Sequence, residues 1–287
     1  MTMDARAAAA ELDEVIRIGR RAASEVRAIY ATPFTVELKG PNDPVTRADR
    51  DANDLICAAL ERAFPGEAII AEESVPSGEG EIARLVAEPR VWFVDPLDGT
   101  REFADRNGEF AVMIGLAVGG RAELGVVVMP TTGEAFAGRV GEGGAFVPAF
   151  LEDAAGARRP LRVSSVADPR DATIVVSRSH LPASATPVIE RLGITRVVPC
   201  GSVGVKVARI VTTAADLYIH GGGGAKRWDT CAPEAILIAA GGRFADLQGA
   251  RTDYASPDLV QSTGILASNA ALYDAVLAIT RGTFAEL

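Results

Sequence analysis

The residues with the clearest capacity for chemistry lie in the segment Asp95-Pro96-Leu97-Asp98-Gly99-Thr100, which holds two carboxylates and a hydroxyl. Residues 91–94 before it are apolar and β-branched or aromatic, which predicts a buried strand that ends at the first aspartate. Ligands of α/β proteins usually bind at the carboxyl ends of strands. Two carboxylates this close repel each other unless a cation lies between them or one is protonated. We therefore favour a divalent-metal site over a simple polar turn.

Further acids follow apolar strands or begin helices elsewhere in the chain. The full set is Asp49, Glu72, Asp95, Asp98 and Asp229. Oxygen-only ligation selects Mg²⁺, with Mn²⁺ as a substitute, over Zn²⁺, and the chain has two histidines in all. Carboxylates that share two or three Mg²⁺ ions are typical of enzymes that transfer a phosphoryl group to water.

Each of these acids also has a structural alternative when it is taken alone. Asp49 can complete a capping box with Thr46, and Asp229 can cap the helix that follows it. Glu72 can belong to a solvated loop after a strand. The roles are compatible, because a carboxylate at a helix N-terminus also faces a region where anions and metals gather. Their joint occurrence is what favours the metal site.

Other polar residues are candidates for activating water or meeting substrate. Thr100 can orient and deprotonate a water molecule if Asp49 accepts the proton, since a threonine alone is too weak a base. The cations that could contact substrate are Arg106, Arg178, Lys206, Lys226 and Arg227.

Periodicity predicts a layered α+β and α/β fold that positions these residues. We expect an α+β half over residues 1–150, in which helices back an antiparallel sheet, and an α/β half over residues 151–287, with the boundary at 151–160. The expected helices carry residues 12–30, 55–64, 187–192, 203–212, 230–240 and 272 onward. The expected strands are 68–71, 91–94, 110–118, 124–129, 135–140, 173–177, 196–198, 216–219, 243–245 and 264–267.

The amino-acid composition excludes several classes of binding partner. The net charge of −9 argues against a nucleic-acid polymer or an anionic membrane surface as partner. No apolar run has the roughly 20 residues needed to span a bilayer, and the N-terminus does not look like a signal peptide. The three widely spaced cysteines suggest neither disulfides nor zinc, so we predict a cytoplasmic protein. A homodimer is one assembly that the sequence leaves open.

Several motifs together resemble the lithium-sensitive, Mg²⁺-dependent phosphomonoesterases of the inositol monophosphatase superfamily. Those shared with the superfamily are Ala71-Glu72-Glu73-Ser74, the 95–100 segment and Trp228-Asp229-Thr230. Others resemble the 3′(2′),5′-bisphosphate nucleotidase branch, namely Thr100-Arg101-Glu102-Phe103, Arg106-Asn107-Gly108-Glu109-Phe110, Ser177-Arg178-Ser179-His180, Gly201-Ser202-Val203-Gly204-Val205-Lys206 and residues 228–234. The resemblance covers residues 36–267.

The resemblance implies roles for individual residues. The metal ligands it implies are Glu72, Asp95, the Leu97 carbonyl, Asp98 and Asp229, with Asp49 as a ligand or base for the most labile ion. It implies that Thr100 activates water with Asp49 or Glu72. The substrate contacts it implies are Gly99 and Thr100 on the phosphate and His180, Ser202 and Lys206 on the nucleotide, beside Asp229. Ser202 stands where glycine often occurs in the family.

We therefore expect hydrolysis of the 3′-phosphate of adenosine 3′,5′-bisphosphate to AMP and phosphate. An inositol or sugar phosphatase on the same scaffold is the main alternative, and Arg101 and Lys206 favour the nucleotide over it. A phosphoaspartate enzyme requires an Asp-x-Asp motif, which the spacing of Asp95 and Asp98 does not match. A binding protein without turnover is disfavoured, because no ligand position is replaced.

Overall fold

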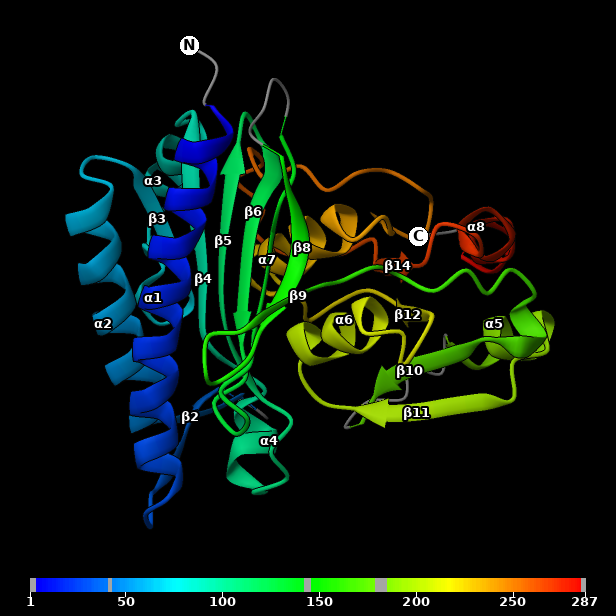
Figure 1. Ribbon diagram of the computed structural model, residues 1–287, viewed down its shortest axis with the longest axis horizontal. Coiled ribbons are helices and arrows are strands. Elements are labelled where there is room, and N and C mark those ends of the chain that lie inside the picture. Colours follow the sequence, from blue (N-terminus) through cyan, green and yellow to red (C-terminus); the bar gives the residue numbers. More distant parts are fainter. Residues whose placement is uncertain (1–3, 41–42, 142–145, 179–184, 285–287) are drawn as a thin grey trace.

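Helices and sheets alternate in five layers in the computed structural model, which describes residues 4–40, 43–141, 146–178 and 185–284 (Figure 1). Helices α1 and α2 cover one face of a seven-stranded sheet, and α6 and α7 lie between that sheet and a five-stranded sheet. Helices α5 and α8 cover the far face of the five-stranded sheet. The layered fold predicted from the sequence is confirmed. The helices are α1 (Ala5–Tyr30), α2 (Arg47–Ala63), α3 (Glu79–Val86), α4 (Thr100–Ala104), α5 (Ala185–Leu192), α6 (Val203–Val211), α7 (Arg227–Ala239) and α8 (Tyr273–Thr283), with short 3₁₀ turns at Glu72–Ser74 and Pro169–Asp171.

The seven-stranded sheet follows chain order from β3 to β9. Its first two strands are parallel and every later pair is antiparallel. The predicted hairpin around residues 119–120 joins β5 to β6. The strands are β3 (Ala68–Ala71), β4 (Arg90–Asp98), β5 (Ala111–Val118), β6 (Arg121–Val128), β7 (Ala135–Arg139), β8 (Val147–Glu152) and β9 (Arg158–Pro160).

Strand β4 is longer than the sequence predicts. We expected it to end before Asp95, but it continues to Asp98. Its pairing with β5 is regular up to Asp95 and resumes where Asp98 lies opposite Ala111. Pro96 has no N–H to donate, so the strand crosses this point as an irregularity in the ladder. Both aspartates are therefore held by sheet pairing rather than by a free loop.

The five-stranded sheet has the order β11-β10-β12-β14-β13. Strands β11, β10 and β12 are parallel, as the alternating strand and helix pattern predicts, and β14 and β13 are antiparallel to their neighbours. The strands are β10 (Thr173–Ser177), β11 (Arg196–Cys200), β12 (Leu217–His220), β13 (Arg243–Ala245) and β14 (Ile265–Ser268).

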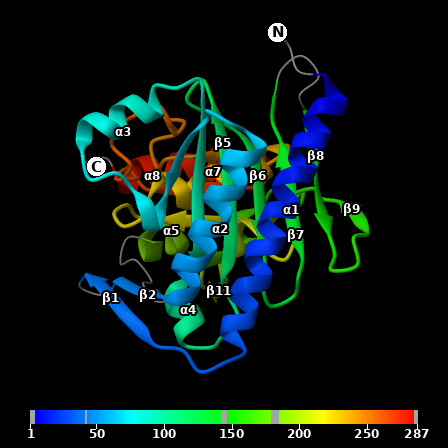
Figure 2. The same ribbon diagram turned by 90° about the vertical axis from the view of Figure 1, so that its left-hand side faces the viewer.

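Two segments in which we predicted neither a helix nor a strand contain strands. Strands β1 (Val36–Gly40) and β2 (Asp43–Thr46) pair with each other and stand apart from both large sheets (Figure 2). The expected boundary at 151–160 contains the end of β8 and all of β9, so the seven-stranded sheet extends to Pro160. We propose that the division into two halves falls after that residue.

Helix α7 is buried on nearly all sides and lies directly on the seven-stranded sheet. A Cβ atom at Gly125 of β6 would come within 2.2 Å of the Ala232 carbonyl oxygen, so only glycine permits this approach. The contact fixes the height of α7 above the sheet. The N-terminus of α7, which carries Asp229, is thereby brought to the end of β4. Among the described residues, no helix is both long and apolar enough to cross a membrane.

Candidate active site

The predicted acids come from four separate elements. Asp95 and Asp98 lie at the end of β4, Asp49 in the first turn of α2, Glu72 directly after β3 and Asp229 in the first turn of α7. Burial raises the pKa of Asp95 most, and the nearby charges of Glu72, Asp98 and Asp229 raise it further, so the four carboxyl groups lie close enough to interact. The structure thus brings together the acids that the sequence singled out.

Asp49 caps a helix and also contacts Thr100. It completes a capping box, because its Oδ2 accepts hydrogen bonds from the Thr46 backbone N–H and hydroxyl, each at 2.7 Å. Its Oδ1 accepts a hydrogen bond from the Thr100 hydroxyl at 2.9 Å. Burial raises the pKa of Asp49, although the bonds from Thr46 and Thr100 oppose this shift. The predicted pairing of Thr100 with Asp49 is therefore present in the structure.

Gly99 makes the turn from β4 into α4 possible. Its φ of +97° lies in the left-handed region, and a Cβ there would also come within 3.0 Å of the Glu109 carbonyl oxygen. The turn places Asp98, Gly99 and Thr100 at the mouth of one cavity.

Asp98 contacts the start of α6. Its Oδ2 accepts hydrogen bonds from the Ser202 hydroxyl and from the Gly204 backbone N–H, the latter at 2.9 Å. Ser202 has a φ of +47°, which lies in the left-handed region and is strained for a residue with a side chain. Its hydroxyl also accepts from the Val205 N–H at 3.1 Å and so caps α6. The hydroxyl that binds Asp98 therefore belongs to a residue in a strained conformation.

Burial and mutual repulsion shift the remaining carboxyl groups. Burial first, and then the charges of Asp98 and Glu72, raise the pKa of Asp229 to about 8, while its bond from the Lys226 N–H at 2.7 Å opposes the shift. Burial raises the pKa of Glu72 to about 7 against the effect of Lys39. The Lys39 ammonium donates to Glu72 at 3.0 Å and to Glu73 at 2.6 Å. Lys39 was not predicted as a site residue, because it lies in β1, where the sequence indicated neither a helix nor a strand.

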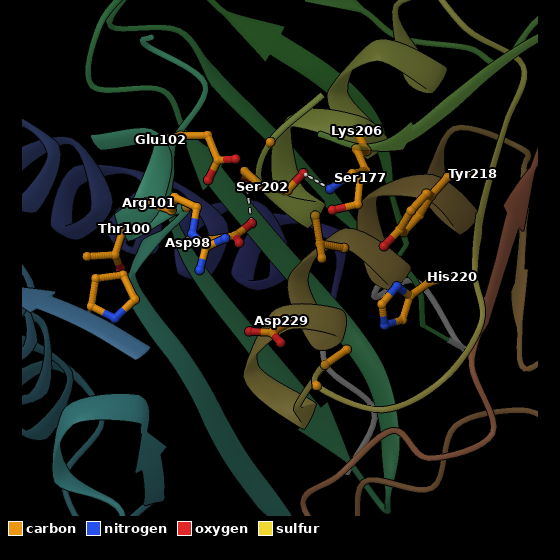
Figure 3. Close-up of a pocket in the computed structure, with 16 residues that line it drawn as sticks. Asp98, Thr100, Arg101, Glu102, Ser177, Ser202, Lys206, Tyr218, His220 and Asp229 are labelled. Atoms are coloured by element: carbon orange, nitrogen blue, oxygen red, sulfur yellow. Dashed lines mark hydrogen bonds between the residues drawn. The ribbon is translucent and has the colours of Figure 1, made fainter. Parts of the chain in front are cut away.

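A cavity of about 280 Å³ opens between the two sheets (Figure 3). The end of β4 and the start of α4 form one wall, and the start of α6 with residues from the ends of β10 and β12 forms the other. Lys206 is 3 % exposed, donates from Nζ to the Ser202 carbonyl at 3.1 Å and lies 5.1 Å from the centre of the Tyr218 ring. Burial lowers the pKa of Lys206, although Asp98 opposes the shift. The predicted residues that line the cavity are Asp98, Gly99, Thr100, Ser202, Lys206 and Asp229.

Two residues of the second wall, Tyr218 and His220, were not predicted from the sequence, and Ser177 was noted only as part of a motif. All three line the cavity. They lie at the ends of β10 and β12, so the rule that ligands bind at the carboxyl ends of parallel strands could have found them.

The other candidate cations are used elsewhere. Arg106 donates to the carbonyls of Tyr30 and Thr32, each at 2.7 Å, and Arg178 is paired with Glu109. Arg227 donates to Gln261. These three arginines and Lys226 are not among the residues described as lining the cavity. His180 lies outside the described residues, so its contact with a nucleotide remains a prediction.

The candidate ligand groups have the chemistry that a hard divalent cation prefers. All the candidates offer oxygen, and several buried carboxyl groups raise one another's pKa, so their ionised forms require nearby positive charge. In the ranges that the structure describes, no three acidic, histidine or cysteine side chains form a ready-made metal cluster. Asp98, Asp229 and Glu72 are each hydrogen-bonded to protein groups instead.

Comparison with known proteins places these features in a family context. The model of the inositol monophosphatase family matches residues 9–282. The 3′(2′),5′-bisphosphate nucleotidase CysQ of Escherichia coli K12 is 35 % identical over 245 residues, which cover 85 % of this chain and 93 % of that protein. The human 3′(2′),5′-bisphosphate nucleotidase 1 is 31 % identical over 81 % of each chain.

Solved structures agree with this fold. CysQ from Bacteroides thetaiotaomicron, described as a bacterial member of the inositol monophosphatase family, has a TM-score of 0.72 at 27 % identity and covers 90 % of this chain and 97 % of its own. The IMPase of Thermotoga maritima has a TM-score of 0.78 at 24 % identity, with 96 % and 98 % of the two chains covered.

Proposed function

Because the chain belongs to the inositol monophosphatase family, a family of phosphoric monoester hydrolases, we propose that it removes the 3′-phosphate of adenosine 3′,5′-bisphosphate. The products are AMP and inorganic phosphate. The observation that carries this proposal is the separation of charge in the cavity. Asp98, Thr100 and Asp229 lie on one side, and the opposite wall holds the buried Lys206. The relatives named bisphosphate nucleotidases support the choice of substrate.

The acidic side of the cavity is the proposed site of reaction. The groups that would hold Mg²⁺, or Mn²⁺ in its place, are Glu72, Asp95, the Leu97 carbonyl, Asp98, Asp229 and Asp49. The chemistry that two or three such ions supply when bound is a lowered pKa of the attacking water and stabilisation of charge on the leaving oxygen.

Thr100 and Asp49 are positioned to handle the proton of the attacking water. The Thr100 hydroxyl donates to Asp49 at 2.9 Å and lies 3.2 Å from the Leu97 carbonyl oxygen. With its proton directed at Asp49, the hydroxyl oxygen can accept a hydrogen bond from water, and it can take the proton of that water as its own proton passes to Asp49. Burial raises the pKa of Asp49, which makes it a better base than an exposed aspartate. The backbone N–H groups of Gly99 and Thr100, at the start of α4, are proposed to bind the phosphate.

The second wall is the proposed site of substrate recognition. The Lys206 ammonium is held by the Ser202 carbonyl beside the Tyr218 ring, so its charge is fixed with little loss of side-chain entropy on binding. A bisphosphate carries a second anionic group that a singly phosphorylated inositol lacks. A buried cation here therefore favours the nucleotide.

The three cysteines, Cys57, Cys200 and Cys231, are all free thiols. This supports a reducing compartment, and we propose that the protein acts in the cytoplasm.

The test is phosphate release from adenosine 3′,5′-bisphosphate and from inositol 1-phosphate in parallel, first with Mg²⁺ and then with EDTA. We expect strong release from the nucleotide that EDTA abolishes. A preference for the inositol phosphate would keep the metal site and overturn the role of Lys206. No release from either, with retained nucleotide binding, would overturn catalysis.

A further inference from the structure

Glu109 lies between the two walls of the cavity without lining it. It follows α4 on the side of the seven-stranded sheet, and three groups from the other half of the chain converge on its carboxylate. Oε2 accepts from the Gly201 backbone N–H at 2.8 Å and from the Arg178 guanidinium at 2.8 Å, and Oε1 accepts from Arg209 at 3.1 Å. Its side chain is 15 % exposed. One carboxylate thus ties the ends of β10 and β11 and the helix α6 to the first half of the chain.

The backbone of Glu109 supports the opposite wall. Its carbonyl oxygen lies against Gly99, where an added Cβ would approach it to 3.0 Å. Main chain and side chain of one residue therefore contact the turn that carries Asp98 and Thr100 and the loop that leads into Ser202. A displacement of Glu109 would alter the spacing between the two walls.

Residues 200–202, which Glu109 contacts, include a strained residue whose conformation must be stabilised by groups outside the loop. Gly201 immediately precedes Ser202, whose φ of +47° is unfavourable for a non-glycine residue. In that conformation the Ser202 hydroxyl donates a hydrogen bond to Asp98. The Gly204 N–H, in the first turn of α6, donates to the same carboxylate. Arg178 adds a second restraint, because it also donates to the Pro199 carbonyl at 3.2 Å.

The same segment is anchored on its other side. Arg106 donates to the backbone at the end of α1 and lies over the Phe34 ring, with 4.8 Å between the guanidinium carbon and the ring centre. Residues 106–109 therefore connect the end of α1 to the loop before α6. The sequence showed this motif clearly, and the chemistry proposed above leaves it without a role.

We propose that Glu109 is a positioning residue that holds residues 200–202 so that Ser202 and the start of α6 bind Asp98 in the geometry needed for turnover. It acts through Ser202 and does not touch substrate. Its kinetic consequence rests on the proposed function, whereas its effect on the Gly201 loop does not.

The decisive variant is Glu109→Gln, which keeps the size of the side chain and removes its charge. We expect kcat to fall by about tenfold or more with a smaller change in KM, because small misplacements of reacting groups are costly. If Glu109 acts through Ser202, the double variant with Ser202→Ala will match Ser202→Ala alone to within about twofold. Losses that multiply in the double variant would overturn the proposal.

The control is Glu152→Gln. Glu152 also binds two arginines, Arg20 at 2.9 Å and Arg158 at 2.7 Å, but it lies on β8, outside the residues described as lining the cavity. Its replacement should leave kcat and KM unchanged. An equal loss in both variants would assign the effect to general loss of ion pairs and overturn the proposal.

A second readout is independent of activity. Hydrogen exchange of a peptide that contains Gly201 should be faster by about tenfold in Glu109→Gln, as expected for loss of a hydrogen bond to a charged acceptor. Unchanged exchange there would overturn the proposal. If the wild type hydrolyses no substrate, the proposed function fails while this measurement still decides the role of Glu109.

Arg178→Met serves if Glu109→Gln does not fold. The Arg178 side chain is 44 % exposed, so its removal should not unfold the protein. It should give smaller changes of kcat and exchange in the same direction. A variant with wild-type values of both would contradict the role assigned to Glu109.

Discussion

The two walls of the cavity are built in different ways. On the acidic wall, Asp98, Gly99 and Thr100 are consecutive residues held by the end of β4 and the start of α4. On the facing wall, Ser177, Ser202, Lys206 and Tyr218 come from three separate elements and the loop before one of them (Figure 3). One short segment thus supplies three residues of the acidic wall, and Asp49, Glu72 and Asp229 reach that side from other elements. The facing wall has no such consecutive segment and is assembled entirely by folding.

The walls also differ in electrostatics. Carboxyl groups of the acidic side repel one another, and burial together with that repulsion raises the pKa of Asp95 well above its usual value. On the facing wall, burial lowers the pKa of Lys206, and Asp98 opposes the shift. Changes to the acidic carboxyl groups should therefore affect turnover, and removal of the Lys206 charge should affect the choice of substrate.

The largest effect is expected for Asp98→Asn. The amide keeps the shape of the side chain but loses a charged oxygen proposed to bind the metal ions, so kcat should fall by about a thousandfold or more. Phosphate release at saturating Mg²⁺ measures it. The control is Asp153→Asn, which removes a carboxylate that accepts two backbone N–H bonds in an exposed turn. Wild-type activity of Asp98→Asn would contradict the metal site.

Thr100→Val should lower kcat by about a hundredfold, because it removes the hydroxyl that donates to Asp49. Thr100→Ser is the matched control, since it keeps that hydroxyl and should retain most of the activity. The two variants are compared at saturating substrate. Equal losses in both would show that a general disturbance of the site, rather than loss of the hydroxyl, lowers kcat, and would remove the hydroxyl from the mechanism.

On the facing wall, Lys206→Met should raise KM for adenosine 3′,5′-bisphosphate by about tenfold or more, as for loss of a charged hydrogen bond. The methionine retains the apolar stem beside Tyr218. Because the acidic wall is intact, hydrolysis of small phosphate esters should change less. Steady-state kinetics on both substrates measure the difference, and equal losses would remove Lys206 from substrate selection.

The smallest effect on activity is expected for Glu234→Gln, which lies on α7 away from the proposed metal ligands. Glu234 is 3 % exposed and accepts from the Tyr254 hydroxyl at 2.7 Å, and burial raises its pKa to about 7. The folded protein therefore retains a proton that the unfolded chain loses near pH 4.3. The proton bound to Glu234 therefore stabilises the folded protein. This stabilisation is complete below pH 4.3 and is lost as the pH rises through 7, which lowers the free energy of unfolding by roughly 3 kcal/mol.

Denaturant unfolding at pH 5 and pH 8 measures this change. Glu234→Gln should lose less stability than the wild type between the two values, because the amide does not ionise. Glu61→Gln, on the surface of α2, should behave like the wild type. An unchanged pH dependence in Glu234→Gln would show that Glu234 does not titrate differently in the two states.

The sequence predicted most elements of the fold because their apolar periodicity is strong. It failed where pairing with another strand, rather than apolar periodicity, decides the structure. Asp95 to Asp98 continue β4 because β5 lies beside them, and Val36–Gly40 and Asp43–Thr46 pair as strands despite their polar composition. The residue pattern of these segments does not indicate that pairing.

By itself the sequence determined which groups are available for chemistry, since the acids, Thr100 and the capping box of Thr46 and Asp49 depend on residue type and short spacing. Only the tertiary structure decided how the remaining charges are used. Arg106 and Arg178 were candidates for binding substrate, but they bind the end of α1 and Glu109. A charged side chain pairs with the opposite charge or carbonyl that folding brings within reach, and for these arginines those partners lie far away in the chain.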